Sequence, residues 1–310
     1  MRLIFLGTPA FAVPTLARIV EAGHQVIAVV TQPDRPHGRG LEPRPSPVKH
    51  TALHFGLPVF QPDRVRRPEA VEYLRSLGAE LMVVVGYGQI LPQAIIDLAP
   101  RGIINVHASL LPKYRGAAPI QWAIIQGEER TGVTTMQINA GLDTGDMLLK
   151  AAIVIGPEEN AVELGERLAT LGADLLVQTL DELAAGKIAP EPQNPADATY
   201  APILNKEDGR IDWNQPAAAI HNRVRGLQPW PGAYTTFRGQ SLHIWRSRPH
   251  LETGMAPGHF LGLKPLAIAC GAGSLELLEV QLAGRKRIAA ADFVNGQRPQ
   301  RTEFFGEPTN

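Results

Sequence analysis

Asn105 and His107 lie two residues apart at the end of an apolar run, residues 102–104. The run indicates a strand, and side chains two apart on a strand share one face, so the amide and the imidazole point the same way. A turn-rich segment follows, which places both at the carboxyl edge of a sheet, where open α/β folds bind ligands. Asp143 comes later, on a glycine-loosened loop, residues 141–146. Two donors suited to a developing oxyanion, with a carboxylate beside them, indicate acyl transfer.

Taken singly, His107 has an ordinary alternative, because a histidine near a sheet is often only a hydrogen-bonded core residue. The combination with Asn105 and Asp143 favours chemistry, and these three are the candidate catalytic residues. No set of residues with metal-ligand spacing accompanies them, so no metal is expected. The turn after the first apolar run, residues 7–11, lacks the second and third glycines of a dinucleotide fingerprint, which disfavours NAD.

The motifs around these residues resemble the signature of a known family. Asn105-x-His107 is followed by the run 109–112 (SLLP) and by residues 114–119 (YRGAAP), and Asp143 completes the set. This combination is similar to that of the folate-dependent formyltransferases. The resemblance implies that 10-formyltetrahydrofolate donates the formyl group and that a primary amine accepts it.

Two further segments extend the resemblance over nearly the whole chain. Residues 7–14 (GTPAFAVP) and 229–233 (PWPGA) narrow it to the tRNA-formylating family. That match implies a protein that formylates the free α-amino group of initiator methionyl-tRNA, which gives N-formylmethionyl-tRNA for translation initiation. The family also suggests a monomer.

In the mechanism that follows, Asn105 and a protonated His107 donate hydrogen bonds to the formyl oxygen as negative charge develops on it. Losing one such donor costs roughly 3 kcal/mol of transition-state stabilisation. Asp143 pairs with His107 and helps to remove the proton of the attacking amine.

A folate pocket requires a flat, largely apolar slot with backbone groups to pair with the pterin edge. A buried strand, residues 83–85, continues into a loop punctuated by glycine, although an ordinary strand and turn would read the same way. By resemblance, this loop, the run 109–112 and the Asp143 loop surround the folate. The residues expected to bind it are Val85, Gly86, Tyr87, Gly88, Gln89, Ser109, Leu110, Leu111 and Pro112.

Arginines recur in a long segment, residues 31–45, that is predicted to lack regular structure. Loops of this length are usually functional or disordered. By resemblance, this loop inserts at the acceptor end of the tRNA, and Arg35, Arg39 and Arg44 are the expected tRNA-binding residues. Leu41 and Glu42 stand where the family often carries two lysines, which leaves the electrostatic attraction to the arginines. A solvated surface loop is the alternative.

The length of 310 residues predicts two domains. Alternating apolar and amphipathic stretches predict a Rossmann-like α/β domain with a mostly parallel sheet over residues 1–186. A proline-rich stretch, residues 187–204, is predicted to be an extended linker. Short strands broken by glycine and proline follow in residues 205–310 and predict a small β domain, which the resemblance makes an OB-like barrel that contacts tRNA.

The predicted strands, in chain order, are residues 3–6, 26–31, 58–60, 81–85, 103–106, 133–138, 147–155, 234–237, 242–245, 266–270 and 275–282. One helix should begin at Ser46-Pro47, with the serine as cap and the proline in the first turn. Another should run over residues 161–184, with Asn160 and Glu163 in capping-box spacing.

Composition limits the remaining classes. Residues 1–204 hold 17 Lys and Arg against 21 Asp and Glu, whereas residues 205–310 hold 13 against 9, so the second part is the better candidate for touching phosphates. No apolar run approaches a membrane span or a signal peptide, so a soluble cytoplasmic protein is expected. The single cysteine, Cys270, is predicted to be a buried thiol. Trp213 and Trp230 are predicted to anchor a core.

Other functions remain open from the sequence. A formyltransferase that acts on a 4-amino-sugar nucleotide would share the first-domain motifs, but such a substrate does not require a long basic loop. Glycinamide ribonucleotide formyltransferase is disfavoured by the second domain. A non-catalytic RNA-binding module is disfavoured because Asn105, His107 and Asp143 are all present.

Overall fold

The computed structural model describes residues 1–37, 42–252 and 254–306. Contacts divide the chain into two compact units. Unit 1 comprises Met1–Pro119, Arg130–Ile153 and Gly165–Ala201, and unit 2 comprises Ile120–Glu129, Val154–Leu164 and the chain from Pro202 onward. Each unit therefore contains segments from distant parts of the sequence.

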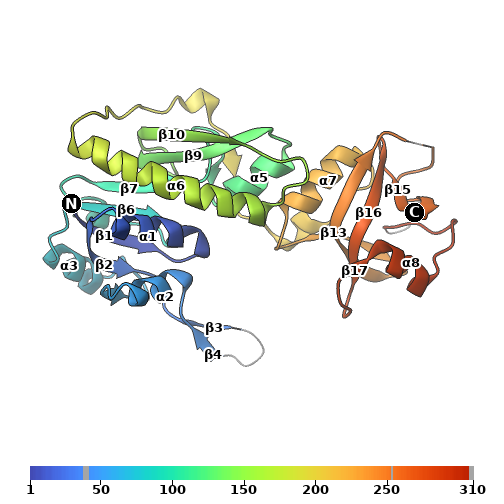
Figure 1. The fold of residues 1–310 in the computed structure, drawn as a ribbon, viewed down its shortest axis with the longest axis horizontal. Helices are drawn as coiled ribbons and strands as arrows, with labels where there is room; N and C mark the ends of the chain where they lie inside the picture. Colours follow the sequence, from blue (N-terminus) through green and yellow to red (C-terminus); the bar gives the residue numbers. More distant parts are fainter. Residues whose placement is uncertain (38–41, 253, 307–310) are drawn as a thin grey trace. The chain divides into compact units, whose positions relative to one another are not determined.

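Unit 1 is built on a seven-stranded sheet of order β10-β9-β7-β6-β1-β2-β5 (Figure 1). The pairs of β1 with β2 and β6, of β6 with β7 and of β2 with β5 are parallel, whereas β7 and β9 are antiparallel. The strands are β1 (Arg2–Gly7), β2 (Gln25–Val30), β5 (Val59–Phe60), β6 (Leu81–Val85), β7 (Ile103–His107), β9 (Arg130–Gln137) and β10 (Met147–Val154). This confirms the mostly parallel α/β class.

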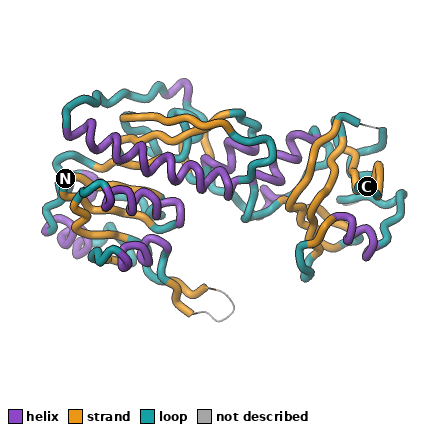
Figure 2. Tube along the Cα trace, viewed as in Figure 1, coloured by secondary structure: helices purple, strands orange, loops and turns teal. Residues whose placement is uncertain are grey.

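Helices cover both faces of this sheet, as the secondary-structure colours of Figure 2 show. Ile4 and Leu6 of β1 cluster with Leu74 of α3 (Pro68–Ser76) and Ile95 of α4 (Gln93–Ile96) on one face. The opposite face meets the long helix α6 (Ala161–Ala184), together with α1 (Val13–Glu21), which is bonded to α6 through Arg18 and Asp174. Both faces are thus dry, which explains the continuous apolar runs of the central strands.

Local capping signals in the sequence form as expected. Ser46 caps α2 (Pro47–His54) by accepting a hydrogen bond from the Lys49 amide at 3.0 Å. At α6, the Glu163 amide donates to Asn160 at 3.1 Å and the Asn160 amide donates to Glu163 at 3.0 Å, which is a complete capping box. Each cap satisfies amides that the first turn leaves without a helical partner.

Unit 2 contains an antiparallel sheet of order β12-β13-β16-β15-β14, with β17 paired to β16. Phe237, Phe260, Phe293 and Phe305 pack edge to face or tilted in its core. The strands are β12 (Ala233–Phe237), β13 (Gln240–His250), β14 (Phe260–Leu263), β15 (Leu266–Ala269), β16 (Ser274–Leu282) and β17 (Ile288–Ala289), and the helices are α5 (Pro119–Ile125), α7 (Ala217–Gly226) and α8 (Ala290–Gln297).

Of the three residues predicted to be buried in this part of the chain, two are buried and one is exposed. Cys270 is buried, and its burial raises the pKa of the thiol to about 12, which confirms a structural thiol. Trp213 is also buried, and its indole N–H donates to Thr235. Trp230 is 57% exposed, so its prediction as a core anchor was wrong. It lies between two prolines in a turn, where no strand carries its side chain inward.

The arginine-rich segment is more regular than predicted. Arg35–His37 (β3) and Glu42–Arg44 (β4) form an antiparallel pair, in which Arg35 lies opposite Arg44 (Figure 1). The prediction of a loop without regular structure was therefore wrong for these residues. The physical reason lies in Pro36 and Pro43, because a residue before proline is restricted to extended backbone, and extended backbone pairs readily. Arg39 lies outside the described residues.

The proline-rich stretch expected to be a linker makes specific contacts. Glu191 pairs with Met147 in an isolated bridge. Tyr200–Ala201 (β11) forms a parallel pair with Arg115–Gly116 (β8). The stretch up to Ala201 thus belongs to unit 1, whereas the expected boundaries were at residues 186 and 204.

None of the helices in the described ranges is both long and apolar enough to cross a membrane.

His221 provides a test of unit 2. Burial, helped by Arg225, lowers the pKa of this imidazole below its ordinary value, against the opposing effect of the Pro157 carbonyl. The unfolded chain then binds a proton at this histidine more readily than the folded chain does. The stability that the neutral His221 contributes is therefore complete above about pH 6.5 and is lost as pH falls through the pKa of the folded state. We expect the unfolding midpoint of wild type to fall more than that of His221→Gln between about pH 7.5 and about pH 5.5. His54→Gln, at an exposed site, should follow wild type. Equal decreases in wild type and His221→Gln would contradict the assignment.

Candidate active site

The three candidate catalytic residues come together in unit 1. Asn105 and His107 lie on one face of β7, and the opposite face packs on α6. Gly172 of α6 makes that packing close, because a Cβ there would lie only 2.8 Å from Val106 Cγ1. The helix thus fixes which way β7 presents its polar face. The Asp143 loop reaches this face, and a carboxylate oxygen lies 3.7 Å from His107 Nδ1.

The two nitrogens of His107 have different surroundings. Nε2 lies 2.9 Å from the Tyr114 carbonyl oxygen, which can only accept, so Nε2 carries a proton. Nδ1 is therefore the nitrogen that can exchange protons, and it faces Asp143. Their separation of 3.7 Å is longer than a hydrogen bond, as is common in sites that tighten when substrate binds.

Asn105 is half-buried, and its side-chain amide makes no hydrogen bond with the described residues. An amide without an internal partner can donate to a ligand at no cost in lost protein bonds. It stands two positions from His107 along β7, on the same face, so both can reach one oxygen atom.

Asp143 is held in an uncommon backbone conformation. Its φ is 51°, in the left-handed region that few residues other than glycine adopt. The Gly116 amide donates to its carboxylate at 2.8 Å. The Gln193 side chain donates to the main-chain oxygens of Asp143 and Gly145, both at 2.8 Å. The loop is thus bonded at its side chain and at its backbone.

Gln193 itself is fixed by a buried arginine. Arg115 donates to the Gln193 side-chain oxygen through Nε at 3.0 Å and through a terminal nitrogen at 2.7 Å. Gln193 is only 9% exposed. Sequence reasoning assigned no role to either residue, since Gln193 stood in the expected linker, 50 positions from Asp143. The pairing of β8 with β11 and the bridge between Met147 and Glu191 bring these segments together.

The segments expected to form the folate slot also meet at the carboxyl edge of the sheet. Thr8, after β1, donates to the Tyr87 carbonyl, after β6, at 2.9 Å. Gly86 packs against Pro9, because a Cβ at Gly86 would lie 2.9 Å from the proline ring. Gly86 and Gly88 are exposed and have φ values of 57° and 84°. Their backbone is open to a ligand.

The run after β7 is tied to the neighbouring strand. Thr134 of β9 donates to the Ser109 carbonyl at 2.7 Å and accepts from the Leu111 amide at 3.1 Å. Ser109 and Leu111 are buried, whereas Leu110 and Pro112 are partly exposed. Only these last two can therefore offer side-chain surface to a ligand.

Two side chains of the expected folate loop face inward or are already bonded. Tyr87 is 2% exposed, and its hydroxyl is buried without a partner among the described residues. Gln89 accepts from the Val65 amide and donates to the Asp63 carbonyl. Ile90 is 92% exposed and Leu142, beside Asp143, is 62% exposed. Ile90 and Leu142 thus add exposed apolar surface to that of Leu110 and Pro112. Both stand in loops expected to surround folate, but neither was among the residues expected to bind it.

Lys49 does not add a free positive charge to the β3–β4 pair that carries Arg35 and Arg44. Its ammonium lies 2.6 Å from the Asp34 carboxylate. The bond to Lys49, with a second bond from Gln61, holds the pKa of Asp34 below its ordinary value. Arg35 and Arg44 are exposed, so among the described residues of β3 and β4 these two carry the positive charge that a ligand can reach.

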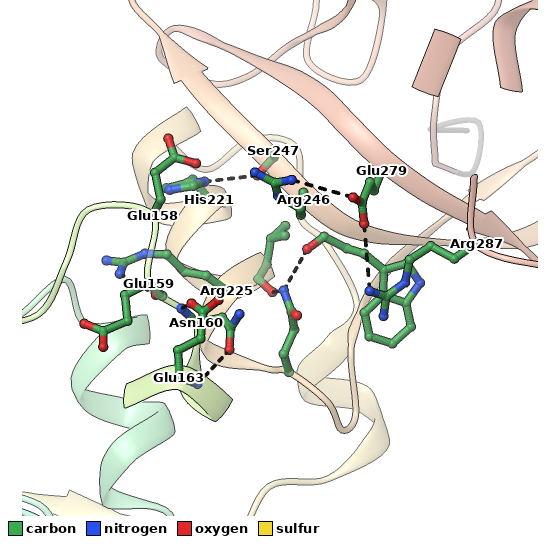
Figure 3. A pocket seen from close by; sticks show the side chains of 13 residues that line it. Glu158, Glu159, Asn160, Glu163, His221, Arg225, Arg246, Ser247, Glu279 and Arg287 are labelled. Carbon is green, nitrogen blue, oxygen red and sulfur yellow. Dashed lines mark hydrogen bonds and ion pairs between the residues drawn. The ribbon is translucent and has the colours of Figure 1, made fainter. Parts of the chain in front are cut away.

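A polar cavity of about 560 Å³ lies within unit 2 (Figure 3). Its charged groups are largely engaged with one another or with backbone: Arg225 donates to the Gly156 and Glu159 carbonyls, and Glu279 lies 3.6 Å from Arg246 and 3.8 Å from Arg287. None of the three candidate catalytic residues lines it. We assign the cavity no part in the chemistry. The described residues also contain no cluster of three or more His, Cys, Asp or Glu arranged to hold a metal.

Comparison with known proteins identifies the class. A family model described as "Formyl transferase" matches residues 1–180, and one described as "Formyl transferase, C-terminal domain" matches residues 203–298. The chain belongs to the formyl transferase family and carries both domains.

Within that family, the chain is similar over nearly its whole length to methionyl-tRNA formyltransferases. The methionyl-tRNA formyltransferase of Solibacter usitatus (strain Ellin6076) is 70% identical over 308 residues, 99% of each chain. That of Citrifermentans bemidjiense is 52% identical over 309 residues, 99% of this chain and 97% of the relative.

Solved structures share the fold at low identity. WlaRD, described as a sugar 3N-formyl transferase, superposes with a TM-score of 0.68 at 17% identity and covers 92% of this chain and 99% of its own. An N-formyltransferase from Helicobacter canadensis gives 0.66 at 18% identity and covers 89% and 98%. At such identities the similarity establishes the fold alone.

A variant at Tyr87 tests whether this residue binds folate through its side chain or only through its backbone. Because its hydroxyl is buried and unpaired, Tyr87→Phe should raise the free energy of unfolding by about 1 kcal/mol. The same variant should leave the KM for a folate donor unchanged. Denaturant unfolding and donor titration measure the two effects, with Tyr73→Phe as the control at a more exposed tyrosine. A higher KM in Tyr87→Phe would show that the hydroxyl reaches the ligand.

Proposed function

We propose that this chain transfers the formyl group of 10-formyltetrahydrofolate to the free α-amino group of initiator methionyl-tRNA, which gives N-formylmethionyl-tRNA. The near-full-length similarity to methionyl-tRNA formyltransferases carries the choice of acceptor. The meeting of Asn105, His107 and Asp143 at one edge of the sheet supports the chemistry.

Asn105 and His107 act on the formyl oxygen in this proposal. As the amine attacks, negative charge develops on that oxygen, and the Asn105 amide and the His107 ring donate to it. With Nε2 held by the Tyr114 carbonyl, Nδ1 of a protonated His107 is the nitrogen that can donate. Placed donors of this kind need no reorganisation when the charge appears.

Asp143 stabilises the protonated His107 and accepts the proton of the amine in this proposal. Its carboxylate faces His107 Nδ1, stabilises the charged ring, and accepts the proton of the attacking amine directly or through one water. The new bond joins the amine nitrogen to the formyl carbon, and the bond from that carbon to folate N10 breaks. The proton released by the amine balances the one that N10 takes up.

The folate lies, in this proposal, against the open backbone of Val85 to Gln89 and against Leu110 and Pro112. Exposed glycine backbone offers donors and acceptors to a pterin edge, and Ile90 and Leu142 offer apolar surface to its rings. Tyr87, Gln89, Ser109 and Leu111 shape the slot through their backbone and packing.

The segment of residues 31–45, with Arg35, Arg39 and Arg44, contacts the acceptor end of the tRNA in this proposal. Arg35 and Arg44 lie opposite each other on β3 and β4, so two positive charges stand side by side at an exposed position. Arginines of this kind contribute binding energy through phosphate contacts.

Loss of one oxyanion donor is the direct test of the chemistry. Asn105→Ala should lower kcat for transfer of labelled formyl to methionyl-tRNA roughly 100-fold to 1000-fold, and His107→Ala at least as much. His54→Ala, an exposed histidine of the same unit, is the control. A 4-amino-sugar nucleotide is offered in parallel. Label on the sugar and not on the tRNA would refute the proposed acceptor, and full activity of the variants would refute the proposed roles.

The salt dependence of tRNA binding tests the role of Arg35 and Arg44. Each phosphate contact removed should lower the slope of log affinity against log salt by about 0.7 to 0.9. The double variant Arg35→Ala/Arg44→Ala should therefore bind methionyl-tRNA more weakly and with a shallower slope, while kcat at saturating tRNA is kept. Arg101→Ala, at the amino end of β7, removes an exposed arginine from the opposite edge of the sheet and should change neither. An unchanged slope in the double variant would show that Arg35 and Arg44 do not contact tRNA phosphates.

A further inference from the structure

We infer that Gln193 is a positioning residue for formyl transfer, acting through the backbone of the Asp143 loop. This inference rests on the proposed function and adds to it a residue outside the catalytic set. Its basis is the chain of bonds that begins at buried Arg115, passes through the Gln193 amide and ends on two carbonyls of the loop.

The hydrogen bonds of the Gln193 amide fix its orientation. Its oxygen takes two hydrogen bonds from Arg115, and its nitrogen gives two, to Asp143 and Gly145. An amide has one acceptor end and one donor end, so the arginine dictates which end faces the loop. Neither a carboxylate nor an aliphatic side chain could present two N–H groups there.

The two carbonyls follow the bend that aims the Asp143 side chain, one in the peptide group directly after Asp143 and the other at Gly145. With φ at 51°, Asp143 turns its carboxylate back toward the Gly116 amide and His107 Nδ1. For a residue other than glycine this conformation persists only when its surroundings hold it. Holding the Asp143 and Gly145 carbonyls fixes the backbone on the carboxyl side of that bend, and this restricts the direction in which the carboxylate leaves the chain.

Gln193 does not touch the reacting atoms in this scheme. A displacement of about 1 Å in a catalytic group can cost on the order of 100-fold in rate. Loss of its donation should therefore appear in kcat, whereas the KM for the amine acceptor should change little because Gln193 binds no substrate.

The informative variant is Gln193→Glu. It keeps oxygen atoms for Arg115, so the buried guanidinium remains paired, but it replaces the donor by an oxygen that faces two carbonyls. Gln193→Ala is less suitable, because it leaves the buried Arg115 guanidinium without its hydrogen-bond acceptor and can fail to fold. Gln228→Ala is the matched control, since Gln228 likewise donates to two backbone carbonyls, those of Val224 and Trp245, but in unit 2.

We expect Gln193→Glu to lower kcat roughly 10-fold to 100-fold, with the acceptor KM within about twofold of wild type. The loss should nearly vanish in an Asp143→Ala background, because the residue then has no carboxylate to aim. Equal losses in both backgrounds, or wild-type kcat in Gln193→Glu, would overturn the inference. The Gln228→Ala variant should retain wild-type kcat.

A readout that needs no activity separates this inference from the proposed function. The Gly116 amide depends on the Asp143 carboxylate, whereas the neighbouring Arg115 and Ala118 amides donate to Thr199 and Ala201. Hydrogen exchange followed by NMR should be faster at Gly116 in Gln193→Glu and unchanged at Arg115 and Ala118. Unchanged exchange at Gly116 would refute the inference. Transfer to a sugar nucleotide instead of tRNA would refute the proposed acceptor and leave the exchange test decisive.

Discussion

The left-handed backbone at Asp143 is the constraint on which the candidate active site depends. A left-handed residue other than glycine is strained by about 1 to 2 kcal/mol. The Gly116 amide and the Gln193 side chain together supply three hydrogen bonds, two to Asp143 and one to Gly145. At about 1 kcal/mol each, they exceed the strain. The carboxylate can therefore be held toward His107 in spite of an unfavourable φ.

The bonds to Asp143 require a rigid support, and buried Arg115 provides it. Arg115 belongs to β8, which pairs with β11, so the segment that carries Gln193 is anchored close to the segment that carries Gly116. A hydrogen bond to a charged group contributes about 1.5 to 3 kcal/mol, more than a bond between two neutral groups. The two bonds from Arg115 to Gln193 therefore help to hold the proline-rich stretch in unit 1.

On the other side of His107, packing decides the geometry. Gly172 allows α6 to approach Val106 closely, and the side chains of Asn105 and His107 then occupy the other face of β7. A larger residue at position 172 would push the helix from the strand that carries both polar groups. The helix, the strand and the loop after β6 converge at the carboxyl edge, where a parallel sheet leaves its connections open to a ligand.

The sequence by itself determined the parts that depend on local rules. The alternation of apolar runs predicted every strand of the seven-stranded sheet to within a few residues, and Ser46, Asn160 and Glu163 marked their helices because capping is a bond between near neighbours. It also determined that Asn105 and His107 share a face, which follows from the period of a strand.

Only the tertiary structure decided how distant segments meet. The links among Arg115, Asp143 and Gln193 join residues up to 78 positions apart. The β3–β4 pair, the exposure of Trp230 and the pairing of Lys49 with Asp34 also escaped prediction. Neither periodicity nor propensity encodes such contacts, because their free energy comes from partners that the chain brings together only when it is folded.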